Sequence, residues 1–166
     1  MYRTLALFAA LTALTSPVQA ATDDSPSQIV GRLYAPYLAN PHAEPDDTAS
    51  AMDRIRPFAT KAFSAAIDKD QACMKREGGI CSLDWDVIIN GQDWELSDFS
   101  LSEVWPYAPP VIVTATFHNG GDVQQVKFYF IQEGIAWKID DIEDQFLDDG
   151  GKVKELVSIK TLLSKD

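Results

Sequence analysis

Asp141 is the acidic residue whose position best suits chemistry, because it belongs to a stretch with the pattern of a β-strand. The alternation of apolar and polar residues predicts that Asp141 lies opposite Val126 on an apolar face, with Asp140 pointing outward. Burial raises the pKa of a carboxyl group, and a carboxyl group so placed can act as a general base or anchor a ligand. The simpler interpretation, which we favour, puts Asp141 at the frayed end of the sheet, in water or bonded to a loop amide.

Aromatic residues with a polar tip are the second feature that suggests a site. Tyr and Trp combine an apolar ring with a hydrogen-bonding group, which suits a half-open pocket. The candidate pocket residues are Tyr34, Tyr37, Asp93, Trp94, Trp105 and Asp141. Tyr34 stands at helical spacing among aliphatic residues, so a place in the ordinary core is the simpler expectation for it. The stiff segment 105–110, Trp-Pro-Tyr-Ala-Pro-Pro, is expected to expose a contact surface for another protein.

Several aspartates surround Trp85 and Trp94, and oxygen ligands of this kind suit calcium. They are Asp84, Asp86, Asp93 and Asp98. The ordered run of acids and glycine that forms a calcium loop does not follow them, so turn and capping hydrogen bonds are the better interpretation. Of these four, Asp93 ranks first as the one expected to be buried and structurally bonded, whereas the acidic runs 140–144 and 148–149 are interpreted as solvated charge. With two histidines, two cysteines and no nucleotide-binding or hydrolase motif, the sequence predicts no metal and no cofactor.

Acidic residues outnumber basic ones in this chain of 166 residues, with 25 Asp and Glu against 14 Lys and Arg and a formal net charge of −11. This balance disfavours binding to the phosphates of nucleic acids and to anionic membrane surfaces. The length fits a single domain. The partner is left open as an unknown small molecule or protein.

The first twenty residues have the pattern of a secretory signal peptide. Arg3 precedes an apolar run over residues 5–14, and residues 18–20, Val-Gln-Ala, suit cleavage by a signal peptidase. The run is too short to span a hydrocarbon core of about 30 Å. We therefore expect residues 1–20 to be removed and residues 21–166 to form one domain that is periplasmic or secreted, with no membrane attachment.

Cys73 and Cys81 are the two cysteines of the chain. The segment between them combines the end of a helix with a flexible glycine pair at 78–79, which lets the chain fold back on itself. An oxidising compartment permits a disulfide, and the spacing is not Cys-x-x-Cys. A structural disulfide is therefore favoured over a redox site.

Helices are expected first along the chain. Apolar residues at spacings of one, three and four predict a helix that opens at Pro26 and is kinked by Pro36 near its end. A loop over residues 40–47 follows. A short helix capped by Thr48 and a longer one from Pro57 to the glycine pair complete this part of the chain.

Residues 110–142 have the clearest pattern, that of a three-stranded antiparallel meander. The first turn, at 119–122, predicts pairing of Phe117 with Gln124, Ala115 with Val126, Val113 with Phe128 and Val111 with Phe130. The second turn, at 133–134, predicts pairing of Phe130 with Trp137, Phe128 with Ile139 and Val126 with Asp141. One face is then almost wholly apolar, and Lys127 lies opposite Asp140 on the other.

Helices followed by an antiparallel sheet of four or more strands indicate an α+β domain with segregated elements. The closing segment 152–163 is either a helix or a strand followed by a helical tail.

Three segments carry a family resemblance. Residues 29–38 have the pattern of a helix with paired aromatic residues. Residues 90–94, Asn-Gly-Gln-Asp-Trp, have that of a loop before a long strand. Residues 134–142 have that of a strand with the sequence Gly-x-x-Trp-Lys-Ile-x-x-Ile. This set resembles the nuclear transport factor 2-like superfamily and, with the signal peptide, the exported bacterial domain-of-unknown-function family 3828. The resemblance spans roughly residues 25–163 and implies N-terminal helices packed on a curved, cone-shaped antiparallel sheet with a pocket between them. Because the superfamily holds both enzymes and non-catalytic binders, it implies a fold and not an activity.

The lack of a paired catalytic constellation favours a non-catalytic periplasmic binding or interaction domain. The alternative is a small cofactor-free isomerase or dehydratase, with Asp141 as the base and a tyrosine as hydrogen-bond donor. A third possibility, compatible with the acidic surface, is protection against an exported toxin by binding it.

Overall fold

The computed structural model describes residues 24–42, 50–147 and 152–165. Within these ranges helices α1 to α3 precede a five-stranded antiparallel sheet and a short helix follows it, which confirms the expected α+β class. The expected signal peptide at 1–20, the cap expected at Thr48 and the acidic run at 148–149 lie outside the described residues.

Helix α1 (Pro26–Ala39) begins at a capping box. Ser25 Oγ accepts a hydrogen bond from the amide of Gln28 at 3.3 Å, and Gln28 Oε1 accepts one from the amide of Ser25 at 2.9 Å. Pro26 occupies the first turn, and Pro36 lies inside the helix near its end, as the sequence predicts. The buried stripe of the helix comprises Pro26, Ile29, Val30, Leu33, Tyr34 and Tyr37.

Helix α2 (Ala51–Ile55) is capped by Ser50, which replaces the predicted Thr48. Ser50 and Asp53 form a capping box, with Asp53 Oδ2 also accepting from the Ser50 hydroxyl at 2.8 Å. A serine followed three residues later by an acid therefore provides the stronger start signal.

Helix α3 (Lys61–Glu77) starts later than predicted, because Pro57 lies in a separate 3₁₀ turn, η1 (Arg56–Phe58). Thr60 is the cap of α3, and its Oγ1 accepts a hydrogen bond from the amide of Phe63 at 3.1 Å. Gly78, with a φ of 69°, ends the helix in the left-handed conformation that glycine allows.

The strands pair in chain order, and every pair is antiparallel. They are β1 (Leu96–Val104), β2 (Val111–Asn119), β3 (Asp122–Glu133), β4 (Ala136–Leu147) and β5 (Val153–Ser158). A short helix, α4 (Ile159–Leu163), follows β5. The closing segment is thus a strand followed by a helical tail, one of the two forms that the sequence left open.

The register of β2 against β3 is the predicted one, from Val111 opposite Phe130 to Phe117 opposite Gln124. The predicted register of β3 against β4 is wrong. Gly134, with a φ of 67°, and Ile135 form the two-residue turn, so that Phe130 lies opposite Ile139 and not Trp137. Glycine is favoured at the first turn position because that position requires a positive φ.

A β-bulge shifts the register of β4 once more. Phe130 lies opposite Ile139 and its neighbour Tyr129 opposite Asp141, so Asp140 is the extra residue of β4. Beyond the bulge the alternation is inverted, and Asp144, not Asp141, lies opposite Val126. Asp144 is fully buried, which contradicts its interpretation as solvated charge.

Because of the bulge, the pairs on the outer face of the meander also differ from those predicted. Lys127 lies opposite Glu143 and forms its ion pair with that residue, Nζ to Oε1 at 3.1 Å, instead of with Asp140. Trp137, expected within the inner cluster, is half-buried at its margin and packs edge-on against Trp105, with ring centroids 5.2 Å apart.

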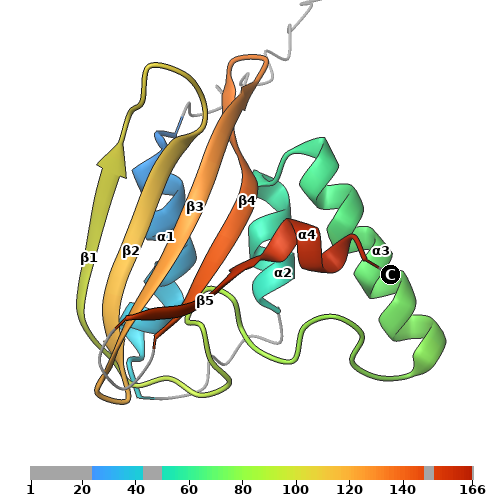
Figure 1. Cartoon of the computed structure of the whole chain (residues 1–166), viewed down its shortest axis with the longest axis horizontal. Helices are drawn as coiled ribbons and strands as arrows, with labels where there is room; N and C mark the ends of the chain where they lie inside the picture. Colours follow the sequence, from blue (N-terminus) through green and yellow to red (C-terminus); the bar gives the residue numbers. More distant parts are fainter. Residues whose placement is uncertain (1–23, 43–49, 148–151, 166) are drawn as a thin grey trace, which may run out of the picture.

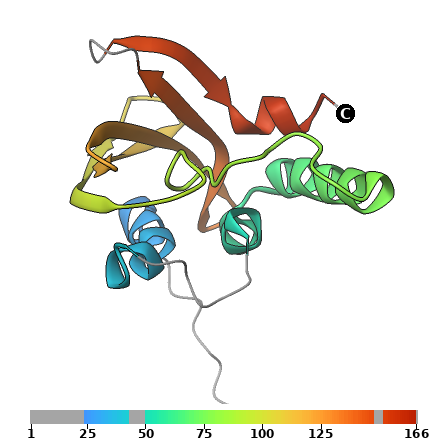
Figure 2. The same cartoon turned by 90° about the horizontal axis from the view of Figure 1, so that it is seen from below.

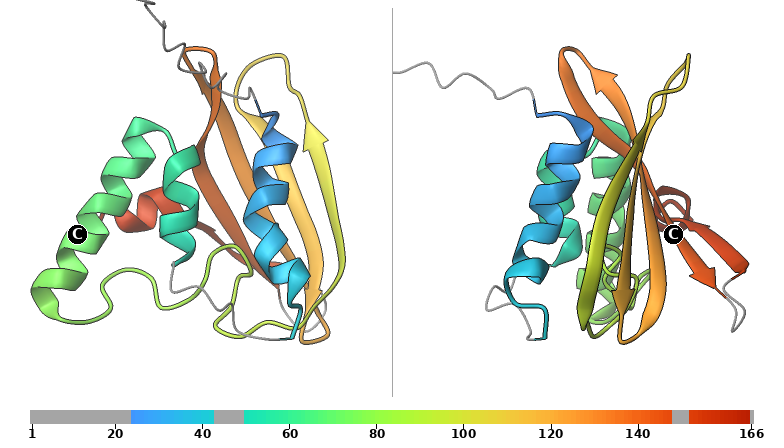
Figure 3. Two further views of the ribbon diagram at one scale, coloured as in Figure 1. Left: turned by 180° about the vertical axis from the view of Figure 1, so that it is seen from behind. Right: turned by 90° about the vertical axis from the view of Figure 1, so that its left-hand side faces the viewer.

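The core lies between the sheet and the helices. Figure 1 shows α1 and α2 against one face of the sheet, with α3 beyond β4. Seen from below in Figure 2, β5 and α4 lie on the far side of the sheet from α1 and return toward α3. The two further views in Figure 3 show the bend of the sheet around α1. The predicted aromatic and aliphatic cluster is confirmed for Phe128, Phe130, Ile139, Val111 and Val113, all of them buried.

Cys73 and Cys81 form a disulfide, as predicted, with their Cα atoms 6.2 Å apart. The bond joins the end of α3 to the segment that follows it. Asp70 of α3 strengthens this connection, since its Oδ1 accepts a hydrogen bond from the amide of Ser82 at 3.0 Å. The beginning of the loop that carries Trp85 is therefore fixed to α3 at two points.

Candidate functional site

Asp144 is the centre of the candidate site. Its Oδ2 accepts a hydrogen bond from the indole N–H of Trp85 at 2.7 Å, whereas its Oδ1 is buried and has no partner among the residues that the structure describes. Burial raises the pKa of Asp144 to about 7; the Trp85 hydrogen bond opposes this shift, and the nearby charge of Asp86 adds to it. A buried carboxyl group that titrates near neutrality is typical of functional sites.

Asp86 directly follows Trp85 in the sequence, and both of its carboxylate oxygens accept hydrogen bonds. Its Oδ1 accepts a hydrogen bond from the amide of Ile88 at 2.8 Å, and its Oδ2 accepts one from the hydroxyl of Tyr37. Arg54 donates to the same Tyr37 oxygen at 2.6 Å and places its guanidinium 5.2 Å from the centre of the Tyr37 ring. Burial raises the pKa of Asp86, and the hydrogen bond from Tyr37 is the main opposing effect. Arg54, Tyr37 and Asp86 thus form a connected polar chain.

Tyr34 brings a second polar group into the core. Its hydroxyl is buried and has no partner within the described ranges. Burial raises the pKa of Tyr34 well above its ordinary value, and the charges of Asp144 and then Asp86 raise it further. Its ring packs between Phe99 and Phe117, with centroids 4.7 and 5.5 Å away. Tyr34 is therefore a core residue, as the simpler expectation had it, but its hydroxyl belongs to the electrostatic surroundings of Asp144.

A half-open pocket of about 550 Å³ adjoins this cluster, between the loop after α3 and the arm made by β5 and α4. Its lining mixes apolar, hydroxyl and charged side chains: Ser82, Trp85, Glu155, Leu156, Val157, Ser158, Thr161, Leu162 and Lys165. The volume lies within the range of small-molecule sites. Trp85 both lines the pocket and bonds to the buried Asp144, so it connects the two.

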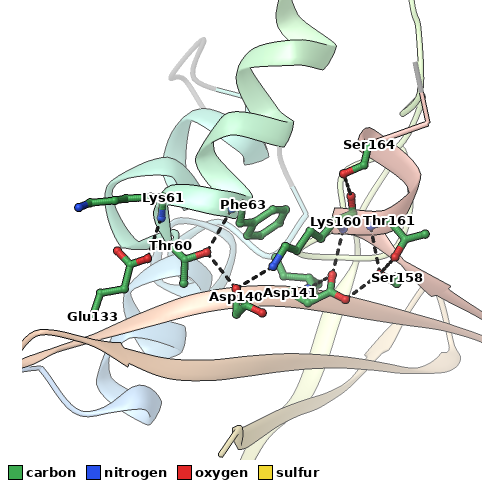
Figure 4. Close-up of polar contacts among 11 residues, drawn as sticks. Thr60, Lys61, Phe63, Glu133, Asp140, Asp141, Ser158, Lys160, Thr161 and Ser164 are labelled. Atoms are coloured by element: carbon green, nitrogen blue, oxygen red, sulfur yellow. Dashed lines mark hydrogen bonds and ion pairs between the residues drawn. The ribbon is translucent and has the colours of Figure 1, made fainter.

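Asp141, the predicted base, has a structural role. It does not face the apolar interior, because it lies opposite Tyr129 beyond the bulge. Figure 4 shows its carboxylate turned toward the start of α4. Asp141 accepts hydrogen bonds from the hydroxyl of Ser158 at 2.7 Å and from the amide of Lys160 at 2.9 Å. The favoured interpretation of a bonded, structural aspartate fits this placement.

Asp140 points toward the helices and not outward as predicted. Its Oδ1 accepts a hydrogen bond from Thr60 Oγ1 at 3.1 Å and forms an ion pair with Lys160 Nζ at 2.8 Å (Figure 4). Asp140 therefore ties the start of α3 to α4. It lies outside the Asp144 cluster.

The remaining candidates are dispersed. Trp94 packs edge-on against Tyr37, with centroids 5.3 Å apart, and its indole N–H donates to the carbonyl of Asn40 at 3.0 Å. Asp93 is exposed, which contradicts the expectation of burial; its carbonyl accepts from the side chain of Asn119 at 3.1 Å. Trp105 is exposed at the far end of β1, away from the candidate site, with Tyr107 beside it in the sequence.

Within residues 24–42, 50–147 and 152–165, no group of three or more His, Cys, Asp and Glu side chains is placed to hold a metal ion. In the same part of the chain no helix has the length and apolar character needed to cross a membrane. In comparisons with known proteins, no family model matches the sequence, and no curated protein or solved structure matches it.

Four residues of the cluster were not among the predicted site residues: Asp144, Trp85, Asp86 and Arg54. The sequence contained one usable signal for Asp144, namely Ile142 and Asp144 at alternate positions behind an acidic run. That signal requires knowledge of the bulge. Trp85 and Asp86 come from a segment without periodicity, and Arg54 comes from the short helix α2, so their place in the cluster depends on tertiary packing.

Proposed function

We propose that this chain is a non-catalytic binding domain that takes a small ligand in the pocket beside Trp85. The observation that carries the proposal is the pocket itself, about 550 Å³ in volume, with an indole, aliphatic side chains and hydroxyl groups in one lining. Apolar surface supplies most of the affinity in such sites, and a few polar groups orient the ligand. The Trp85 wall is fixed from behind by its hydrogen bond to Asp144.

The proposal includes export to an oxidising compartment. The Cys73–Cys81 disulfide supports it, because such bonds persist outside the reducing cytosol. The N-terminal sequence pattern, Arg3 before a short apolar run, supports it independently.

We also propose the cone-shaped fold of the nuclear transport factor 2-like superfamily, and membership of exported family 3828, as the finer assignment. Helices ahead of a bent antiparallel sheet support this assignment. The strand containing Trp137 and Lys138, on which the sequence resemblance rests, is β4, which also carries Asp144.

Binding of anilinonaphthalene sulfonate tests the pocket. Leu156 and Val153 are both exposed on β5, but only Leu156 lines the pocket, so glutamate at either position leaves the core intact. We expect saturable binding to the wild type, a loss of about tenfold or more in Leu156→Glu, and wild-type affinity in Val153→Glu. Equal affinities in all three proteins, or no saturable binding of this probe, would overturn the proposal.

A second candidate function is proton transfer on a small substrate, the isomerase or dehydratase alternative, with Asp144 in place of Asp141 as the base. The raised pKa of Asp144 favours it, as does the buried hydroxyl of Tyr34, which has no partner among the described residues. Because Asp144 is fully buried and bonded to Trp85, this function requires the side chains around Asp144 to move before a substrate reaches it. Deuterium exchange at the α-carbons of small ketones, measured for the wild type and for Asp144→Asn, tests this function: exchange that is enhanced by the wild type and lost in the variant would establish it. A protein partner at Trp105 and Tyr107 stays a prediction.

A further inference from the structure

The loop before β1 places Trp85 between two different environments. On one side its ring lines the pocket with Leu156 and Val157 of β5. On the other its indole N–H reaches Oδ2 of Asp144 at 2.7 Å. Any change at Asp144 therefore acts on a wall of the pocket directly. The inference that follows concerns the regulation of this pocket and rests on its proposed function as a ligand site.

Few charged groups surround the Asp144 carboxylate. Across the sheet its neighbours are apolar, Val126 on β3 and Val157 on β5. From the loop, the charge that acts on it is that of Asp86; from α1 the group is Tyr34, whereas Tyr37 interacts with Asp86. Arg54 of α2 is directed to the Tyr37 oxygen, and Glu155 and Lys165 line the pocket with Trp85. Among the described residues, Trp85 is the one hydrogen-bond donor to Asp144.

The chemistry of this pair makes the hydrogen bond depend on charge. An indole N–H is a donor only, and its bond to an ionised carboxylate is shorter and stronger than its bond to a neutral carboxylic acid. Proton binding at Asp144 weakens the bond to Trp85 and also removes the repulsion from Asp86. Since burial raises the pKa of Asp144 to about 7, both forms are populated near neutrality.

We propose that proton binding at Asp144 releases Trp85 from its fixed position and thereby weakens ligand binding in the pocket as the solution becomes acidic. The carboxylate form holds the indole against β4, so the pocket wall is rigid and the ligand binds to a preformed surface. The protonated form leaves the indole with a weaker anchor, and part of the binding free energy is then spent on ordering it.

The first test needs no ligand. In protein labelled with ¹⁵N-tryptophan, the indole resonance of Trp85 is identified by its disappearance in Trp85→Phe. We expect this resonance to shift with pH around a midpoint near neutrality in the wild type and to stay constant in Asp144→Asn, whose amide has nearly the same shape and does not titrate. Asp84→Asn, at an exposed position of the same loop, is the matched control and keeps the wild-type shift. A Trp85 resonance that does not change between about pH 5 and pH 9 would overturn the proposal.

The second test measures binding of anilinonaphthalene sulfonate, whose sulfonate stays ionised throughout that range. We expect the affinity of the wild type to fall by about threefold or more from pH 8 to pH 5.5, relative to the change in Asp144→Asn. The two proposals fail differently. If probe binding depends on Leu156 but has the same pH dependence in the wild type and in Asp144→Asn, the proposed control by Asp144 is wrong and the pocket stands as a ligand site. If the Trp85 resonance titrates but the probe does not bind at any pH, the pocket is not a ligand site, although Asp144 still acts on Trp85.

Discussion

The carboxylate of Asp141 accepts a hydrogen bond from the backbone amide of Lys160 at 2.9 Å, and so a side chain of β4 holds the first turn of α4. Its other oxygen accepts from the hydroxyl of Ser158, the last residue of β5. β5 and α4 form one wall of the pocket. Asp141 therefore acts on the candidate site through the position of this wall, although it does not touch the pocket itself.

Replacement of Asp141 by alanine is expected to lower the free energy of unfolding by about 1–2 kcal/mol, because a helix start loses its capping acceptor. Urea denaturation measures the change. Asp84→Ala, at an exposed position in the loop, serves as the control and is expected to change stability by less than about 0.5 kcal/mol. Equal effects of the two substitutions would show that the Asp141 hydrogen bonds contribute nothing to stability.

The stability of the protein is expected to depend on pH through Asp144. The pKa of this group is about 7 in the folded protein, above its ordinary value, so the folded form binds the proton more tightly. The resulting stabilisation is fully present below about pH 4, declines as the pH rises, and is lost above about pH 7. Asp144→Asn removes this dependence, because its side chain is neutral throughout.

Urea denaturation of the wild type and of Asp144→Asn, at about pH 4, 6 and 8, tests this dependence. Other acids titrate in the same range, so the informative quantity is the difference between the two proteins. We expect the variant to gain stability relative to the wild type with rising pH, by up to about 4 kcal/mol at pH 8. A difference that is constant with pH would mean that Asp144 titrates alike in the folded and unfolded chains.

The two faces of β3 are expected to respond differently to truncation. Phe128 is fully buried in the core, so Phe128→Ala is expected to cost about 3–5 kcal/mol through lost burial and the cavity left behind. Lys127 lies on the outer face in a partly exposed ion pair with Glu143, and Lys127→Ala is expected to cost about 0–1 kcal/mol. Chemical denaturation compares them, and similar costs would contradict the assigned faces.

Loss of the disulfide between Cys73 and Cys81 is expected to lower stability by about 2–3 kcal/mol, because the closed loop restricts the unfolded chain. The comparison is between the wild type and a variant with both cysteines changed to alanine, by urea denaturation without reductant. Mass spectrometry after alkylation of the unreduced wild type should detect no free thiol. Two alkylated cysteines would contradict the bond.

The α+β class, the helix start at Pro26 and the β2–β3 register could all be predicted from local signals. A capping serine, an Asn-Gly-Gly-Asp turn and a strict alternation act within a few residues, and the sequence shows each of them. Where two local signals competed, the prediction failed: Ser50, with Asp53 in its capping box, is the cap of α2 where Thr48 was predicted.

The candidate site could not be predicted in the same way. Its identity depends on whether Asp141 or Asp144 faces inward, and that depends on one extra residue in β4. A bulge leaves no mark in the composition or in the alternation of polar residues around it, because Asp140, Asp141, Glu143 and Asp144 are all acidic. Trp85 adds a long-range contact, since it lies 59 positions from Asp144 in the sequence.

The bulge at Asp140 also marks the point at which β4 can change in length, which side-chain chemistry does not show. Deleting this one residue would remove the bulge and leave the other pairs between β3 and β4 unchanged, with Ile142 and Asp144 inward and Glu143 outward. A deletion between Ile142 and Asp144 would instead exchange the inward and outward positions that follow it. In a set of related sequences, a one-residue gap in this part of β4 should therefore fall at the bulge and not beyond it.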